Sequence, residues 1–483
     1  MITVRVKNNI QISKVGLDYR TKEHIKNMMT FKDPNNTQNL YLFYKDGESS
    51  IDVPRGAVLG IKRILASTGK PVKWVSNVCI NRRDPPILDS LNIKLRDYQK
   101  ECVSKMLTKV QGIVQMPCGA GKTTTGATAM ILSGQSGLVL THTKEILEQW
   151  VSTIERISGM KCRNLSSSQK KINWMPLKKG EIAVAMIQTI SSKIKSFEKQ
   201  NVKKFLQSVG CVMTDEAHHV PAEQWRAIVT YISARYRWGL TATPERSDGL
   251  GFMLNIFIGP TLFKVSTKFL IKKEYLQTPT IIPIATGYRP NKNDYGYMRG
   301  DRNTLNYTRA VSSLCKSKKR NKLICELAKK ARKYNRQILI LVSRKSNAEL
   351  IQQKLEMMLV TSAVMTGDTK VSNRRLILKS FKKGKIKILV ATQLADEGLD
   401  VPNIDCIIAA SPAKHHARVL QRVGRSLRLG SKQPIIFDLV DEQEFRSQFF
   451  HRNRAYTKEY GNVVLPENTL EQALFYLEQS SNT

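Results

Sequence analysis

Acidic residues are scarce in this sequence: 39 Asp and Glu stand against 78 Lys and Arg, so the formal net charge is +39. A chain this basic repels itself unless a polyanion neutralises it, which indicates nucleic acid as the partner. With 483 residues, of which 41% are hydrophobic, the chain is long enough for about three domains and too rich in core-forming residues for wholesale disorder.

The sequence also lacks the patterns of secreted, membrane-spanning and zinc-binding proteins. No apolar run approaches the ~20 residues that span a bilayer, and the first ten residues, MITVRVKNNI, lack the apolar segment of a signal peptide. The eight cysteines lie far apart with no Cys-x-x-Cys pair. We therefore expect a reducing, aqueous compartment, no membrane partner, no zinc site and free thiols that lie mostly in the core.

Hydrophobic patterning divides the chain into a small N-terminal region and two α/β series. Residues 1–90 alternate apolar and polar positions and carry a helical stretch at 58–65, which predicts an accessory α+β domain that binds nucleic acid or a partner protein. Short apolar runs alternate with amphipathic stretches at 91–260 and again at 336–445, as in βαβ units. The predicted fold is α/β, with two tandem parallel-sheet domains.

Two further regions complete the predicted organisation. A connecting segment at 261–335 contains a Lys-rich run at 316–333, which we expect on a helix with a solvated face, and a tail at 446–483 is expected to pack on the core. The predicted strands are 112–115, 137–141, 182–186, 211–214 and 238–241 in the first series, and 337–342, 361–365, 386–391, 405–409 and 434–439 in the second.

The strongest motif is MPCGAGKT at 116–123, which follows an apolar strand and precedes a helical run, as a phosphate-binding loop does. Its glycines let backbone N–H groups face phosphates, and the helix N-terminus adds its positive end. We predict that Lys122 reaches the β- and γ-phosphates and that Thr123 ligates Mg²⁺. Met116 stands where the strict pattern has Gly, so a chance glycine-rich turn remains an alternative for this motif alone. The predicted nucleotide contacts are Pro117, Cys118, Gly119, Ala120, Gly121, Lys122, Thr123 and Thr124.

A second motif places an acidic pair at the end of a buried strand. The apolar run at 211–214 leads into Asp215 and Glu216, followed by Ala217 and His218. We predict that Asp215 holds Mg²⁺ and that Glu216 orients and deprotonates the attacking water. His218 is predicted to couple the nucleotide site to the nucleic-acid site. Such a pair arises by chance on its own, but its place beyond a phosphate loop makes chance a poor explanation.

Positive charge for the transferring phosphoryl group comes from the second series, in the run QRVGRSLR at 421–428. We predict catalytic roles for Gln421, Arg425 and Arg428. If the phosphate loop lies in one domain and these arginines in the other, the site is complete only when the domains close, and hydrolysis lets them reopen. A basic helical face explains the run less well, because Gly424 interrupts it.

Taken in order over residues 91–445, these motifs resemble the superfamily 2 helicases and translocases of the DEAH class, which implies two RecA-like domains. LRDYQ at 95–99 resembles the element that reads adenine, with Gln99 as the reading residue. LTHT at 140–143 and IQT at 187–189 resemble motifs that grip the nucleic-acid backbone, and GLTATPER at 239–246 resembles the coupling motif. LVS at 341–343 and the run from ATQ at 391–393 to DEGLDVP at 396–402 resemble motifs IV and V.

The resemblance assigns roles to further residues. It implies nucleotide contacts at Gly398 and Asp400, coupling by Thr241 and Thr243, and nucleic-acid contacts by Thr141, Gln188, Thr189, Thr392 and Gln393. Each threonine taken alone is as well explained as a strand or cap residue.

The wording of two motifs is most similar to the DNA-directed XPB-like and UvsW-like branch, and the length, basicity and small N-terminal domain are similar to the poxviral transcript-release DNA helicases. This resemblance implies a monomer that uses ATP and Mg²⁺ to move 3′ to 5′ on single-stranded or duplex DNA, with weaker RNA binding. It also implies a transcription elongation complex with RNA polymerase and viral elongation factors as partners, and a place in the virion and host cytoplasm.

Two other functions stay open at the level of sequence. A repair or recombination helicase that remodels branched DNA would carry the same motifs. A basic nucleic-acid-binding scaffold that keeps a non-hydrolysing nucleotide site is also compatible with the composition, although the intact Lys122, Asp215, Glu216, Arg425 and Arg428 argue against it.

Replacing Arg425 tests its assignment to phosphoryl transfer. We expect Arg425→Ala to lower the ATP turnover number by more than about tenfold, since such an arginine contributes roughly 10³–10⁵ to the rate. Steady-state ATP hydrolysis at saturating nucleic acid measures this. A variant that loses only nucleic-acid affinity would show that Arg425 belongs to the strand path instead.

Overall fold

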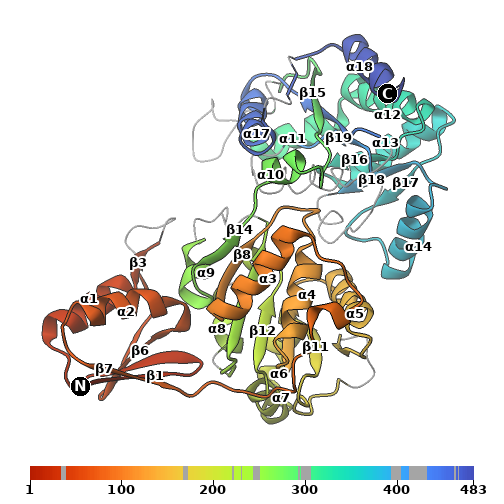
Figure 1. Cartoon of the computed structure of the whole chain (residues 1–483). Coiled ribbons are helices and arrows are strands. Elements are labelled where there is room, and N and C mark those ends of the chain that lie inside the picture. Colours follow the sequence, from red (N-terminus) through yellow and green to blue (C-terminus); the bar gives the residue numbers. More distant parts are fainter. Residues whose placement is uncertain are drawn as a thin grey trace. The chain divides into compact units, whose positions relative to one another are not determined.

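The computed structural model of the chain is drawn in Figure 1 and describes residues 1–33, 40–166, 172–219, 222–229, 231–242, 251–291, 294, 306–392, 404–412, 432–461, 464–465 and 467–482. The chain forms two compact units: Met1–Pro117 with Gly121–Val265, and Cys118–Ala120 with Ser266–Thr483. Among the described residues, no helix combines the length and the apolar character needed to cross a membrane.

The first unit begins with a small sheet covered by two helices. Its strand order is β5-β6-β2-β1-β7, with β7 parallel to β1 and the other pairs antiparallel. Alternation buries one face: Ile2 and Val4 share a core with Ile25 and Ile61 of the helices, which lie over that face (Figure 1). The elements are β1 (Ile2–Val6), β2 (Asn9–Ser13), α1 (Tyr19–Met28), β5 (Lys45–Asp46), β6 (Ser50–Pro54), the 3-10 helix η1 (Arg55–Ala57), α2 (Val58–Ala66) and β7 (Val72–Ser76); β3 (Thr30–Lys32) pairs separately with β4 (Leu40–Leu42).

The same unit continues as a parallel sheet of seven strands in the order β10-β11-β9-β12-β13-β8-β14. The strands are β8 (Gln111–Gln115), β9 (Gly137–Thr141), β10 (Arg163–Leu165), β11 (Ile182–Met186), β12 (Cys211–Thr214), β13 (Tyr236–Thr241) and β14 (Thr261–Lys264). The helices are α3 (Asp97–Lys109), α4 (Lys122–Leu132), α5 (Lys144–Ser158), α6 (Ile187–Ile194), α7 (Lys199–Gln207), α8 (Ala222–Val229) and α9 (Phe252–Phe257). All five predicted strands of this series are present, and β10 and β14 extend the sheet.

The second unit is built on a parallel sheet of six strands in the order β15-β20-β19-β16-β18-β17. The strands are β15 (Thr280–Ala285), β16 (Ile338–Val342), β17 (Ala363–Met365), β18 (Ile388–Thr392), β19 (Cys406–Ala409) and β20 (Ile435–Val440). The helices are α10 (Thr267–Lys272), α11 (Tyr307–Lys316), α12 (Lys318–Lys333), α13 (Lys345–Met357), α14 (Val371–Lys382), α17 (Glu444–Tyr460) and α18 (Leu470–Asn482). The predicted fold class, two tandem RecA-like parallel-sheet domains with a small N-terminal domain, is confirmed.

The segment 261–335 is divided between the two units and is not a separate connector. Its first strand, β14, pairs with β8 at the edge of the first sheet. Its second strand, β15, pairs with β20 and so belongs to the second sheet. The structure places the boundary between Val265 and Ser266.

The Lys-rich run lies on α12, as expected, but its face is not only solvated. Lys318 and Lys322 are exposed, whereas Arg320 is buried. Arg320 Nε donates to Asp441 Oδ1 at 2.8 Å and Nη2 donates to Asp441 Oδ2 at 3.0 Å. The exposed lysines form the expected solvated face, and Arg320 lies on the opposite, buried face, where a bidentate carboxylate partner from a distant part of the chain compensates its burial.

The N-terminal domain is anchored to the first α/β domain by two buried arginines. Arg55 of η1 donates from Nε to Gln111 Oε1 at 2.9 Å and from Nη2 to the carbonyl of Arg235 at 2.7 Å. Arg237 of β13 donates in the other direction, from Nη2 to the carbonyl of Asn8 at 3.3 Å. The N-terminal domain thus packs on the first α/β domain within one compact unit, and the two share one apolar cluster.

Gly56 lies at the tightest contact of this junction. A Cβ atom at this position would stand 2.3 Å from the carbonyl oxygen of Asn255 and 2.4 Å from that of Ile256, both of which belong to α9. We expect Gly56→Ala to lower the free energy of unfolding of the first unit by about 1–3 kcal/mol, because backbone atoms must move to make room. Urea unfolding followed by fluorescence measures this loss.

Gly47→Ala is the matched control, because its nearest neighbour would be the Ser50 carbonyl oxygen at 3.4 Å. Equal unfolding midpoints for the two variants would contradict the tight junction.

Candidate functional site

The predicted nucleotide residues lie together at the carboxyl ends of three adjacent strands of the first sheet. Because β12, β13 and β8 are parallel neighbours, their carboxyl ends lie side by side. The loop that starts at Met116 follows β8, Asp215 follows β12, and Thr241 ends β13. The backbone N–H of Met116 donates to the Thr241 carbonyl at 3.0 Å, and the Met116 side chain is fully buried. Met116, which stands where the strict loop pattern has Gly, thus adds one hydrogen bond between the end of β8 and the end of β13.

The glycines of the loop adopt the backbone conformation that the motif requires. Gly119 and Gly121 have φ angles of 79° and 78°, in the left-handed region that favours glycine. Gly121 also precedes the first residue of α4, and a Cβ atom there would stand 2.5 Å from Nε2 of Gln99. Gln99 is held in place because its Oε1 accepts from the Arg96 backbone N–H at 3.0 Å. The predicted adenine-reading residue therefore lies against the phosphate loop, while its role stays a prediction.

A chain of polar contacts joins the loop to the acidic motif and to the end of β13. Lys122 Nζ lies 3.5 Å from Glu216 Oε1, and Glu216 Oε2 lies 3.5 Å from His218 Nδ1. His218 Nδ1 in turn lies 2.8 Å from Thr241 Oγ1. The structure thus brings two predicted catalytic residues and two predicted coupling residues into one cluster. The cluster thus joins Lys122, the predicted phosphate ligand, to Thr241 at the end of β13.

Glu216 has a strained backbone at the centre of this cluster. Its φ angle is 42°, in the left-handed region that a residue with a Cβ seldom adopts, and such strain costs about 1–3 kcal/mol. Its backbone N–H donates to Asp215 Oδ1 at 2.9 Å. Such strain persists only where the surrounding structure holds the residue in place.

Asp215 is buried and hydrogen-bonded to an indole. Its side chain is 5% exposed, and Trp150 Nε1 donates to its Oδ2 at 2.6 Å. Burial, together with the nearby Glu216 carboxylate, raises the pKa of Asp215 to about 6, while the Trp150 hydrogen bond and the Lys122 charge act in the opposite direction. The sequence does not reveal this contact, since an indole on an apolar helical face gives no sign of a partner in a distant strand.

The residues at this edge suit a magnesium ion held together with nucleotide phosphates. Asp215 provides one buried carboxylate, and Thr123 provides a half-buried hydroxyl in the first turn of α4. Within the described ranges, no group of three or more His, Cys, Asp and Glu residues could hold a metal. A single carboxylate and a hydroxyl fit Mg²⁺, which takes one or two carboxylates and completes its shell with water and phosphate oxygens.

The predicted nucleic-acid contacts are less accessible than the resemblance implies. Thr141 has no exposed surface, and its Oγ1 lies 3.4 Å from the carbonyl oxygens of Thr143 and Ala185. The prediction that this hydroxyl holds a phosphate is therefore not supported. Thr189 and Thr392 are 8% and 7% exposed, and Gln188 is exposed. The predicted residues Thr243, Gln393, Gly398, Asp400, Gln421, Arg425 and Arg428 lie outside the described residues.

Trp150→Phe tests the electrostatics of the acidic motif. The substitution removes the N–H group that lowers the pKa of Asp215 and keeps an aromatic ring, so we expect this pKa to rise further. The acid limb of the pH profile of ATP hydrolysis should move to higher pH by about one unit, the equivalent of one hydrogen bond to a charged group.

Trp174→Phe is the control, since Trp174 is also buried and its Nε1 has no hydrogen-bond partner among the described residues. Identical shifts in both variants would show that the indole hydrogen bond does not set the pKa of Asp215.

Comparisons with known proteins agree with this geometry. Residues 92–246 match the family model described as "Type III restriction enzyme, res subunit", and residues 318–430 match "Helicase conserved C-terminal domain". The chain is 25% identical over 403 residues to the "DNA 3'-5' translocase XPB2" of Sulfurisphaera tokodaii, which covers 77% of this chain and 86% of the relative. It is 26% identical over 474 residues to the "Putative ATP-dependent RNA helicase L396" of Acanthamoeba polyphaga mimivirus, which covers 94% of this chain and 84% of the relative.

A solved structure shows the same fold at low sequence identity. It is the Saccharomyces cerevisiae protein Dbp5 bound to RNA and ADP BeF3, with a TM-score of 0.59 and 14% identity over 80% of this chain and 94% of that one. The two helicase models fall on the two α/β domains, and the first of them contains the cluster around Lys122 and Asp215. The chain is therefore an ATP-hydrolysing helicase that belongs to helicase superfamily 2.

Proposed function

We propose that the protein is an ATP-driven DNA translocase or helicase of the XPB type. The observation that carries this proposal is the contact chain from Lys122 through Glu216 and His218 to Thr241, which joins the residues of phosphate binding to the end of a neighbouring strand. The similarity to a DNA translocase over 77% of the chain supports DNA as the track. The net charge of +39 supports a polyanionic partner.

The residues of the cluster divide the work of hydrolysis between them. Lys122 and the backbone N–H groups of the glycine loop bind the phosphates of ATP, and Asp215 with Thr123 hold Mg²⁺, which offsets the charge of those phosphates. Glu216 orients the attacking water and accepts its proton. His218 contacts both Glu216 and Thr241, so a change in the charge or position of the Glu216 carboxylate alters the contacts at the end of β13.

The finer proposal is a role in ending transcription, by release of nascent RNA from the elongation complex. The DEAH run at 215–218, the excess of basic residues and the small N-terminal domain support a likeness to the poxviral transcript-release helicases. Under this proposal the protein moves 3′ to 5′ on DNA as a monomer, meets RNA polymerase and viral elongation factors, and is found in the virion and the host cytoplasm.

A second candidate substrate is RNA. A relative that is 26% identical over 94% of this chain carries the name of a putative RNA helicase. The two substrates are separated by measuring ATP hydrolysis with single-stranded DNA, duplex DNA or RNA of equal length at several salt concentrations. Stimulation by RNA alone would overturn the DNA proposal, and a preference for branched over linear duplexes would favour repair or recombination.

Lys122→Ala links the nucleotide site to transcript release. We expect this variant to lose ATP hydrolysis by at least about a hundredfold, because the main positive charge on the phosphates is removed, while DNA binding persists. On stalled elongation complexes, the unchanged protein should release labelled RNA only when ATP is present, and the variant should release none. RNA release without ATP hydrolysis would contradict the proposed role.

A further inference from the structure

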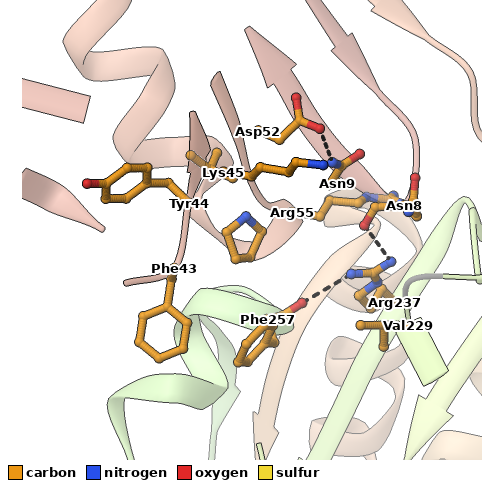
Figure 2. Close-up of a pocket in the computed structure, with 12 residues that line it drawn as sticks. Asn8, Asn9, Phe43, Tyr44, Lys45, Asp52, Arg55, Val229, Arg237 and Phe257 are labelled. Carbon is orange, nitrogen blue, oxygen red and sulfur yellow. Dashed lines mark hydrogen bonds between the residues drawn. The ribbon is translucent and has the colours of Figure 1, made fainter. Parts of the chain in front are cut away.

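A second site lies apart from the nucleotide cluster, between the N-terminal sheet and the first α/β domain. The cavity has a volume of about 250 Å³. Its lining residues, drawn in Figure 2, come from both parts. Lys45, Asp52 and Arg55 belong to the N-terminal sheet and η1, whereas Arg237 and Phe257 belong to β13 and α9. Because both parts lie in one compact unit, the cavity is a fixed feature of that unit.

Two buried guanidinium groups line this cavity without a carboxylate partner. Arg55 is 3% exposed and Arg237 is 1% exposed, and neither forms an ion pair with a described residue. All their hydrogen bonds go to neutral acceptors: for Arg55 the Gln111 side chain and the carbonyls of Lys7, Ala234 and Arg235, and for Arg237 the carbonyls of Asn8, Ile232 and Phe257. The Nε atom of Arg237 is buried and has no hydrogen-bond partner among the described residues.

Two buried guanidinium groups destabilise the folded protein unless an anion lies near them. Burying an unpaired charge costs several kcal/mol, and arginine does not escape this cost by losing its proton. Burial lowers the pKa of Arg55 to about 10, and burial together with the charge of Arg55 lowers the pKa of Arg237. Two like charges beside one cavity therefore make it a strongly positive environment.

The one carboxylate in the lining is already engaged by its own sheet. Asp52 Oδ2 accepts from Asn9 Nδ2 at 3.0 Å and from Gln11 Nε2 at 3.1 Å, and Asp52 Oδ1 accepts from Ser50 Oγ at 2.9 Å. Asp52 also stands directly opposite Lys45 in the β5–β6 pair. Three cations against one carboxylate leave an excess of two positive charges. A phosphate monoester carries nearly two negative charges at neutral pH and matches this excess.

The rest of the lining suits a ring. Phe43 and Phe257 are buried and Tyr44 is half-buried, and Figure 2 shows Phe43 and Tyr44 across the cavity from Arg237. Ligand pockets usually measure about 300–1,000 Å³, so a cavity of about 250 Å³ has room for one phosphate and the ring next to it, and the rest of a larger ligand lies outside the cavity.

We propose that this cavity binds a phosphate monoester together with the ring that carries it, with the phosphate next to Arg237 and Arg55 and the ring against the aromatic side chains. Two sources present this chemistry: a free nucleoside monophosphate, and the 5′-phosphorylated end of a nucleic-acid strand. The proposal does not depend on the substrate of the helicase, since it concerns a separate cavity and its test measures binding alone.

Titration calorimetry with phenyl phosphate tests the site. The full chain is used with saturating ADP and Mg²⁺, which fill the nucleotide site. We expect one phenyl phosphate per chain, with benzoate binding at least about tenfold more weakly, because its single charge leaves one cation uncompensated. Phenol should not bind measurably. The proposal is overturned if phenyl phosphate does not bind at millimolar concentration, or if phenol binds as tightly.

Variants show whether binding occurs in this cavity. Arg237→Met should weaken phenyl phosphate by at least about tenfold, and Lys45→Ala, at an exposed position, by about two- to fivefold. Lys73→Ala is the matched control, since Lys73 is an exposed lysine of β7 that does not line the cavity. If Arg237→Met fails to fold, Lys45→Glu replaces it, with the same expected loss. Unchanged affinity in Lys45→Glu, or equal losses in the Lys73 control, overturns the proposal.

Competition against phenyl phosphate then identifies the source of the ligand. Thymidine monophosphate and a short thymidine oligonucleotide are compared, the latter with either a 5′-phosphate or a 5′-hydroxyl end. Displacement by the monophosphate alone assigns a free nucleotide, and displacement only by the phosphorylated oligonucleotide assigns a strand end. Displacement by neither, or equally by the hydroxyl-ended strand, overturns the proposed ligand chemistry.

Discussion

The contacts that run from Lys122 through Glu216 and His218 to Thr241 depend on the alignment of three parallel strands. β13 lies between β12 and β8, so the loops after all three begin at the same edge. The hydrogen bond from Met116 to Thr241 fixes where the phosphate loop leaves the sheet, and the packing of Gly126 against Trp150 and Leu240 sets the depth of α4. A shift of one strand by one residue would reverse its side chains and separate the cluster.

A second constraint is the way in which the N-terminal domain is attached. Apolar contacts around η1 and α9 bring the surfaces together, and Arg55 and Arg237 add side-chain hydrogen bonds across the junction. Buried arginines bind carbonyl groups with directional donors, so they specify one arrangement where apolar contact alone would tolerate several. These two arginines also leave positive charge in the interior, and both of them line the cavity.

Much of the architecture could be predicted from local pattern, and the exceptions have physical reasons. Each of the ten predicted strands is present within a few residues, because strands buried on both faces read as continuous apolar runs. β15 was not predicted: it contains Pro283, which a sheet accepts here since β15 is an edge strand. β14 was not predicted because two of its four residues are exposed.

At the site, motifs formed by neighbouring residues could be predicted, whereas contacts between residues far apart in the chain could not. The glycine loop and the acidic pair are local signals, and the structure brings them together. The Trp150 hydrogen bond to Asp215 and the Arg320 pair with Asp441 join residues far apart in the chain, and no periodicity reveals such partners. The burial of Thr141 could not be predicted either. The residue fits its motif, but β9 has a neighbouring strand on each side, and the motif does not show this.

The placement of α18 has a consequence for synthesis. The first sheet gains its last strand, β14, just before the boundary at Val265. The second sheet begins with β15, whose neighbour β20 lies some 150 residues later, and Ala473 and Leu477 of α18 close its core. The first unit can thus reach its native form while the ribosome is still translating, whereas β15 stays without its neighbour until β20 has emerged.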